Sequence, residues 1–157
     1  MDLAPPLDDL IERVRALRSE PGERVILGIV GAPGAGKSTL ARALTVALNE
    51  SAPGTAVQVP MDGFHLADVQ LERLGLRRVK GSPPTFDDVG YAVLLERLRR
   101  DRQRTVYAPD FEHAVEQPIA GSINVEPSVE MVITEGNYLL LPDGAWPRVR
   151  AACHEVW

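Results

Sequence analysis

The stretch from Ile26 to Leu44, ILGIVGAPGAGKSTLARAL, decides the fold of this chain. It begins with a short apolar run typical of a buried strand, breaks at a glycine-rich turn and continues with residues that favour a helix. Between the two, residues 31–38 match G-x-x-x-x-G-K-[ST] at every fixed position. In this motif, successive backbone N–H groups and the positive end of the following helix bind phosphate oxygens. We therefore expect a bound nucleoside triphosphate.

The motif assigns separate roles to its residues. Lys37 is expected to reach the β- and γ-phosphates, and the hydroxyl of Ser38 is expected to bind Mg²⁺. The predicted phosphate-binding residues are Gly31, Ala32, Pro33, Gly34, Ala35, Gly36, Lys37, Ser38 and Thr39.

Apolar segments that suit strands alternate with segments that suit helices along most of the chain. The predicted strands are residues 24–30, 55–61, 104–111 and 128–136, and the predicted helices are residues 38–50, 67–76, 88–101 and 145–153. Residues 119–127 are predicted to form a hairpin or excursion, and residues 154–157 to open a further strand. This alternation predicts an α/β fold, a three-layer sandwich in which helices cover both faces of a mostly parallel sheet.

Polar segments follow four of the predicted strands. They are GAPGAGKST (31–39), MDGFH (61–65), APDFEH (108–113) and TEGNY (134–138). Ligands in open α/β sheets bind at the carboxyl ends of the strands. We therefore expect these four segments to converge on one site.

Two carboxylates are candidates for catalysis. Asp62 follows a predicted strand, where it could accept the proton of an attacking hydroxyl, although an Asp-Gly pair is also typical of a plain turn. Glu135 ends an apolar strand and could hold Mg²⁺ or orient a nucleophile. Phosphoryl transfer depends mainly on positioning and charge neutralisation, so these groups with Lys37 form a sufficient set.

Other function classes lack their signatures. A GTPase would need N-K-x-D, which is absent, and the formal D-x-x-G at Asp87–Gly90 follows Pro-Pro-Thr-Phe and suits a helix cap better. The hydrolytic switch is therefore disfavoured. Three histidines without metal-ligand spacing predict no zinc site, and Cys153 has no second cysteine for a disulfide.

Charge and hydropathy limit the partners. The net charge is −5, and the arginine-rich run ERLRRDRQR (96–104) is expected to be a solvated helix surface, so no nucleic-acid partner is predicted. The N-terminus does not resemble a signal peptide, and every apolar run is shorter than the ~20 residues that cross a bilayer. These features predict a cytoplasmic protein without a membrane partner.

Five segments, in order, carry a family resemblance. They are GIVGAPGAGKSTLA (28–41), VPMDGFHL (59–66), LGLRRVKGSPPTFD (74–87), VYAPDFEHAVEQPI (106–119) and VITEGNYLLL (132–141). The chain resembles the P-loop kinases of the uridine kinase, phosphoribulokinase and bacterial pantothenate kinase group. The resemblance spans about residues 25–157 and implies one P-loop kinase domain, with a nucleotide-binding core at residues 23–157. Residues 1–22 are predicted to add a helix and linker, because Leu10, Ile11, Val14 and Leu17 repeat at helical spacing after Asp8 or Asp9.

The resemblance also implies an activity and its residues. The expected reaction is ATP- and Mg²⁺-dependent transfer of the γ-phosphoryl group to a hydroxyl of a small metabolite, with uridine-like nucleosides, pantothenate and sugars all open. Asp62 matches the catalytic aspartate, and Glu135 matches the acidic residue beside the phosphate loop. Phe64, His65, Tyr107 and His113 fall in segments that line the acceptor pocket, with core packing or surface positions as the alternative. Arg78 and Lys80 could meet an acidic acceptor or lie solvated.

The resemblance is incomplete at the C-terminus. Family members continue with another strand, an arginine-bearing lid and a segment on the adenine, which these 157 residues do not contain. We therefore expect triphosphate binding to be retained more reliably than turnover. The alternative function is a nucleotide-binding regulatory or remnant domain without acceptor phosphorylation. The unpaired sheet edge leaves a homodimer open.

Overall fold

A computed structural model describes residues 6–157, so the first five residues of the predicted N-terminal segment lie outside it. At its centre is a sheet of four parallel strands in the order β2 (Ala56–Gln58), β5 (Met131–Gly136), β1 (Val25–Val30) and β6 (Glu155–Val156). The predicted α/β fold with a mostly parallel sheet is confirmed. The opening strand predicted at residues 154–157 is present as β6.

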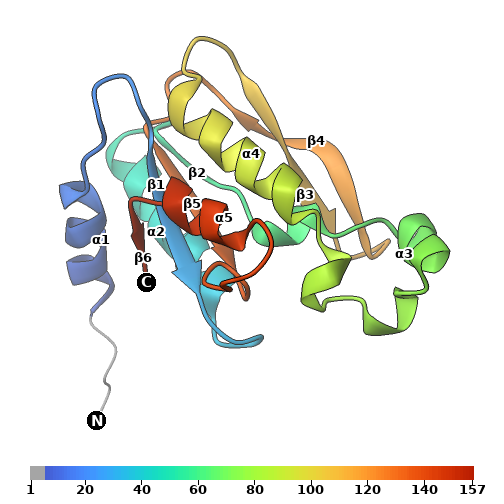
Figure 1. Cartoon of the computed structure of the whole chain (residues 1–157). Helices are drawn as coiled ribbons and strands as arrows, with labels where there is room; N and C mark the ends of the chain where they lie inside the picture. Colours follow the sequence, from blue (N-terminus) through green and yellow to red (C-terminus); the bar gives the residue numbers. More distant parts are fainter. Residues whose placement is uncertain (1–5) are drawn as a thin grey trace.

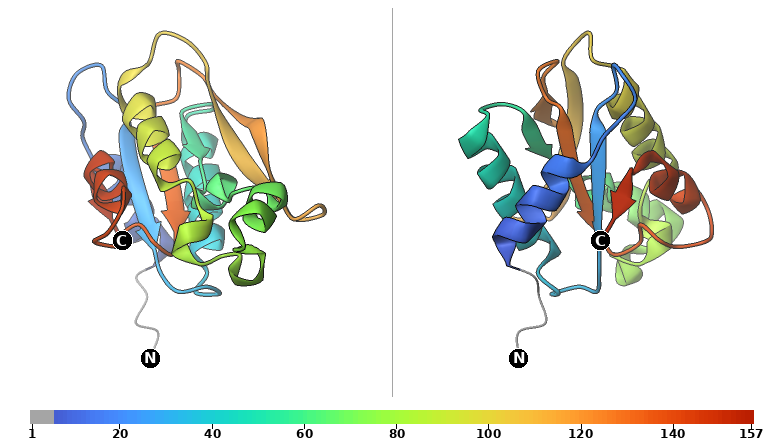
Figure 2. Two further views of the ribbon diagram at one scale, coloured as in Figure 1. Left: turned by 45° about the vertical axis from the view of Figure 1, so that its right-hand side comes forward. Right: turned by 90° about the vertical axis from the view of Figure 1, so that its left-hand side faces the viewer.

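Helices cover both faces of this sheet (Figures 1 and 2). They are α1 (Leu7–Ala16) and α2 (Lys37–Ser51) on one face, and α4 (Asp88–Arg100) and α5 (Trp146–Ala152) on the other. Successive strand side chains point to opposite faces, so Ile26 packs in the core beneath α4 and α5 while Leu27 packs beneath α1 and α2. This two-sided burial explains why β1 and the first half of β5, Met131–Ile133, are continuous apolar runs.

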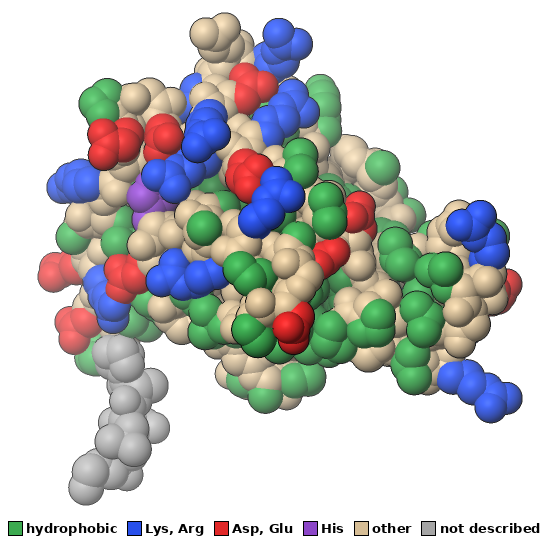
Figure 3. Space-filling view, in the orientation of Figure 1, with side chains coloured by type: hydrophobic (Ala, Val, Ile, Leu, Met, Phe, Trp, Pro, Cys, Tyr) green, Lys and Arg blue, Asp and Glu red, His purple; other side chains and the backbone are tan. Residues whose placement is uncertain are grey.

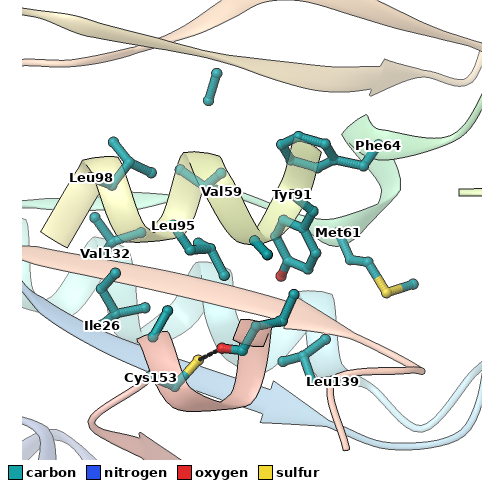
Figure 4. Packing of buried hydrophobic residues seen from close by; sticks show 14 of the residues in the cluster. Ile26, Val59, Met61, Phe64, Tyr91, Leu95, Leu98, Val132, Leu139 and Cys153 are labelled. Carbon is teal, nitrogen blue, oxygen red and sulfur yellow. Dashed lines mark hydrogen bonds between the residues drawn. The ribbon is translucent and has the colours of Figure 1, made fainter. Parts of the chain in front are cut away.

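Tyr91 of α4 is the polar centre of the larger core cluster (Figure 4). Its ring packs on Phe64, with 4.7 Å between ring centroids. The hydroxyl of Thr134 donates to the carbonyl of Val59 at 2.6 Å, so the phenol of Tyr91 donates in turn to Thr134. Burial raises the pKa of Tyr91 well above its ordinary value. The network therefore joins α4 to the end of β5 and to the segment that follows β2.

One predicted strand lies outside the parallel sheet. β3 (Val106–Glu112) pairs antiparallel with β4 (Gln117–Val125), which is the excursion predicted at residues 119–127. The expectation that APDFEH follows a strand of the main sheet is therefore wrong, because Ala108–Glu112 lies within β3. The physical reason is that β3 alternates buried and exposed residues, a pattern that suits a half-exposed hairpin and not a strand covered on both faces.

Short elements connect β2 to α4. They are the 3₁₀ turn η1 (Met61–Phe64), the helix α3 (Asp68–Leu74), and the 3₁₀ turns η2 (Arg77–Val79) and η3 (Pro83–Thr85). Asp87 caps α4 by accepting the N–H of Gly90 at 2.8 Å, which confirms the cap predicted for the D-x-x-G sequence. Apolar side chains are exposed on and around α3 (Figure 3). Over α4 and α5, positively and negatively charged side chains are mixed on the surface. No helix among residues 6–157 has the length and apolarity to cross a membrane.

His154 links the start of β6 to β1. The backbone N–H of Ile26 donates to its Nδ1 at 3.0 Å, and its own N–H donates to the carbonyl of Ile26 at 2.8 Å. Burial, with a contribution from the nearby Arg99, lowers the pKa of His154 below 6.5. Since Nδ1 must be unprotonated to accept, the folded state holds the neutral imidazole.

We expect the stability of the protein to fall as the pH drops below 6.5, the ordinary pKa of histidine. Between that value and the lowered folded pKa of His154, the unfolded chain binds more protons, so acidification favours unfolding. Urea unfolding at about pH 7.5 and about pH 5.5 measures the loss. His154→Asn keeps an acceptor near the Nδ1 position and cannot titrate, so its loss should be smaller. Equal losses in both proteins would show that His154 does not contribute.

Candidate functional site

The phosphate loop connects β1 to α2. β1 ends at Val30 and α2 begins at Lys37, so the motif lies between a strand and a helix N-terminus as the sequence predicts. Gly34 and Gly36 have φ of +77° and +88°, in the left-handed region that glycine adopts at little cost. The Nζ of Lys37 folds back to donate to the carbonyl of Ala32 at 2.9 Å. The side chain of Lys37 therefore lies against the backbone of the phosphate loop.

Glu135 reaches the loop because β5 is the neighbour of β1. In the parallel register Ile29 pairs with Glu135, one residue before β1 ends. The hydroxyl of Ser38 donates to Oε1 of Glu135 at 3.0 Å, and Glu135 is only 5% exposed. Two predicted metal-binding residues from distant parts of the sequence thus meet beside the loop.

The environment of Glu135 suits a bound cation. Burial raises its pKa; the hydrogen bond from Ser38 and the charge of Lys37 oppose this, and the nearby Asp62 and Asp110 add to it. The described residues contain no cluster of three His, Cys, Asp or Glu side chains able to hold a metal ion. Ser38 and Glu135 supply the few oxygen ligands that Mg²⁺ takes from a protein when phosphates and water complete its shell.

Asp62 lies across a cavity of about 270 Å³ from the phosphate loop. The cavity is lined by Ser38, Arg42, Gln58, Pro60, Asp62, Asp110, Phe111, His113, Ile123 and Glu135. The structure therefore brings together four predicted site residues, Ser38, Asp62, His113 and Glu135. The side chain of Asp62 is 48% exposed, so an incoming molecule can reach its carboxylate.

Sequence reasoning missed several residues of this cavity. Arg42 follows Ser38 by four residues on α2, so helical periodicity alone could have placed both on one face. Asp110 and Phe111 belong to APDFEH (108–113), a segment expected at the site, although neither residue is predicted individually; they reach the cavity from the β3–β4 hairpin, which docks against η1. The segment therefore reaches the cavity as expected, but as part of a hairpin and not after a strand of the main sheet.

Two glycines fix the position of the segment that carries Asp62. A Cβ on Gly63 would lie 2.4 Å from the carbonyl oxygen of Pro109 in β3. A Cβ on Gly136 would lie 2.5 Å from the sulfur of Met61. The glycines of MDGFH and TEGNY therefore allow η1 to pack tightly between the hairpin and the end of β5.

We expect Gly63→Ala to move η1 away from the hairpin, because the atom it would strike belongs to the backbone of β3. Overpacking of this kind costs about 1 to 3 kcal/mol of stability. Any acceptor-dependent turnover should fall, while Mg-ATP binding should persist because the phosphate loop is on another segment. Thermal unfolding and calorimetric titration with Mg-ATP measure the two effects. Unchanged melting and turnover would contradict the close-packing argument.

A second cavity of about 460 Å³ adjoins the first, sharing Phe111 and His113 with it. Its lining is His65, Arg77, Arg78, Lys80, Gly81, Phe111, His113 and Glu116. The ring of His65 lies between Phe86 and Phe111, with centroid distances of 4.1 and 4.8 Å. The predicted residue His65 is therefore a wall of this second cavity.

The cations of the second cavity differ in their pairing. Lys80 donates to Asp68 at 2.7 Å, and Arg77 pairs with the other oxygen of Asp68 at 2.9 Å. These contacts lower the pKa of Asp68, chiefly through the hydrogen bond from Lys80. Arg78 forms no ion pair with a described residue, so its charge faces the cavity without a fixed partner.

Two predicted acceptor residues lie elsewhere. Phe64 is 9% exposed and packs in the core against Tyr91. Tyr107 is 62% exposed on β3, and neither residue lines either cavity. The structure therefore does not bring them to the space beside Asp62.

The fold and the loop define a class of α/β protein. In this class a phosphate loop follows one strand of the sheet, and a buried carboxylate on the neighbouring strand lies beside the loop. No family model matches the chain. "Putative uridine kinase C227.14" of Schizosaccharomyces pombe is 38% identical over 144 residues, covering 88% of this chain and 61% of the relative. The pantothenate kinase of Lacticaseibacillus casei is 29% identical, covering 84% of this chain and 43% of the relative.

A solved structure agrees with these relatives. The "putative fructose transport system kinase" of Silicibacter sp. TM1040 has a TM-score of 0.84 and 38% identity, covering 96% of this chain and 72% of that one. The chain belongs to the P-loop kinases of the uridine kinase and pantothenate kinase group. It spans 61% of the length of the curated S. pombe relative.

Proposed function

We propose that the protein transfers the γ-phosphoryl group of ATP to a hydroxyl group of a small metabolite. The observation that carries this proposal is the meeting of Ser38, Asp62 and Glu135 around one cavity at the phosphate loop. A domain that only held a nucleotide would have no need of a half-exposed carboxylate facing the loop across an open space.

Each residue has a role in the proposed reaction. The backbone of residues 31–39 and Lys37 would hold the triphosphate, and Ser38 with Glu135 would hold Mg²⁺. Bound Mg²⁺ would neutralise charge on the β- and γ-phosphates. Asp62 would accept the proton of the acceptor hydroxyl while the oxygen of that hydroxyl forms a bond to the γ-phosphorus. The bond between the γ-phosphorus and the oxygen of the β-phosphate would break at the same time, releasing ADP.

The two adjoining cavities support an acceptor longer than its reactive end. The first cavity would hold the reacting hydroxyl beside Asp62. The second cavity would hold the rest of the acceptor between the ring of Phe111 and the positively charged side chains at and around Arg78. This lining favours an acceptor with an acidic group, such as pantothenate, over a neutral nucleoside or sugar. The names of the relatives include uridine, pantothenate and fructose, so all three belong in a test.

A second candidate is a nucleotide-binding domain without acceptor phosphorylation. It rests on the phosphate loop between β1 and α2, which would bind a triphosphate without any acceptor. The two candidates differ in whether an acceptor changes ATP consumption.

The deciding experiment measures ADP release from Mg-ATP in the presence of nucleosides, pantothenate or simple sugars. Turnover stimulated by one acceptor would establish the kinase and identify its substrate. Lys37→Met should lose both turnover and Mg-ATP binding, since it removes the charge that meets the phosphates. Flat ADP release across the panel, with Mg-ATP still raising the melting temperature, would support the nucleotide-binding domain.

A further inference from the structure

A cavity of about 380 Å³ lies far from the proposed reaction site. It is bordered by Val25, Ala56 and Met131, the first residues of β1, β2 and β5. Because the three strands are parallel, the cavity lies at their N-terminal ends. The phosphate loop and Glu135 lie at the opposite, C-terminal ends of the strands. The cavity is therefore separate from the space around Asp62.

The floor of this cavity is apolar. Its apolar lining consists of Leu17, Val25, Leu48, Ala52, Ala56 and Met131. Leu48 and Val25 are almost fully buried, so the floor is continuous with the core beneath α1 and α2. A ligand with an apolar body would remove this floor from water.

Three arginines stand around the floor, and no described carboxylate pairs with them. Arg15 donates to the hydroxyl of Ser51, and Arg18 donates through Nη1 to two backbone carbonyls at 2.6 and 2.8 Å. Arg102 makes one long contact of 3.5 Å with the carbonyl of Pro127. A guanidinium has five N–H donors, so each arginine keeps donors for a ligand.

The acidic residues of the lining do not cancel this charge. Glu23 pairs with Arg99 at 2.6 Å, outside the cavity lining. That leaves Glu130 as the acidic lining residue without a described ion pair, against three arginines. The surplus of charge at the cavity is positive, although the whole chain has a net charge of −5.

We propose that this cavity binds a small organic anion, with its apolar body on the Leu48 side and its carboxylate, sulfonate or phosphate on Arg18 and Arg102. A planar guanidinium meets such an oxyanion through two parallel hydrogen bonds. The apolar floor favours an anion with a hydrocarbon or aromatic body over a free inorganic ion. The run at residues 96–104 is thus more than a solvated helix surface, because Arg102 turns into this cavity.

The cavity and the phosphate loop lie at opposite ends of the same two elements, β1 and α2. β1 runs from Val25 at the cavity to Val30 at the loop, and α2 runs from Lys37 at the loop to Ser51 at the cavity. The proposal concerns binding at this cavity and holds whether or not the protein phosphorylates an acceptor.

The probe is 8-anilinonaphthalene-1-sulfonate, an aromatic sulfonate whose fluorescence rises in apolar sites. Titration of the whole chain with this probe should give saturable binding. The binding should persist with saturating Mg-ATP, because the two sites lie at opposite ends of the parallel strands. Arg18→Gln combined with Arg102→Gln should weaken binding about tenfold or more, the loss typical of a charged hydrogen-bonding partner. The uncharged analogue N-phenyl-1-naphthylamine should respond little to these changes.

Two variants provide controls. Arg104→Gln removes an exposed arginine from the same run outside the cavity and should leave binding unchanged. Ala52→Phe should block the floor while keeping all three arginines, and its melting temperature verifies that it is folded. Absence of binding to the wild type, displacement of the probe by Mg-ATP, or equal binding by folded Ala52→Phe would overturn the proposal.

Discussion

Asp62→Asn is expected to lower acceptor-dependent ADP release by about 10²- to 10⁴-fold, the range that general base catalysis contributes. Asparagine has the shape of aspartate but cannot take the proton of the acceptor hydroxyl. Mg-ATP should bind with unchanged affinity, because the triphosphate is held by residues 31–39 on a different segment. Steady-state kinetics with the acceptor found by the panel, and calorimetry with Mg-ATP, measure the two quantities.

Asp110→Asn is the matched control for this variant. Asp110 lines the same cavity, but its Oδ1 accepts the N–H of Phe111 at 2.8 Å, so we expect it to shape the hairpin. Its loss of turnover should be much smaller than that of Asp62→Asn. A similar loss in both variants would show that negative charge in the cavity matters and that Asp62 is not the base.

Arg24→Met is expected to give the largest loss of stability, about 3 to 5 kcal/mol, because it breaks a buried hydrogen-bond network. Arg24 is fully buried just before β1. Its guanidinium donates to the carbonyls of Leu98 at 2.7 Å, Val129 at 2.9 Å and Glu126 at 3.0 Å, and also to that of Asp101. Burial lowers its pKa, yet it stays charged at neutral pH.

Methionine fills similar space but leaves those carbonyls without their donor. Urea unfolding measures the free energy, and Arg24→Lys should lie between the wild type and Arg24→Met because it keeps the charge with fewer donors. Arg104→Met, at an exposed position near the end of α4, should change stability by less than about 0.5 kcal/mol. A loss of less than about 1 kcal/mol for Arg24→Met would mean that water replaces the guanidinium at these carbonyls.

Local features of the sequence predicted a large part of this protein. The phosphate loop is a contiguous motif whose ligands are successive backbone N–H groups, so its position between β1 and α2 follows from one stretch of residues. The cap at Asp87 and the buried strand β5 that carries Glu135 are local in the same sense. Parallel neighbours then bring Glu135 to Ser38, which general topology rules anticipate.

The tertiary structure decided the rest, because those features depend on contacts between distant segments. The antiparallel pairing of β3 with β4 removes residues 106–112 from the main sheet and sends Asp110 and Phe111 to the cavity, while Tyr107 faces outward. The carbonyls that hold Arg24 come from two segments more than 70 residues away. Periodicity reports which side of an element is buried, but not which partner covers it. The sequence alone therefore determined the phosphate loop and the layers, and packing between remote segments determined the walls of the site.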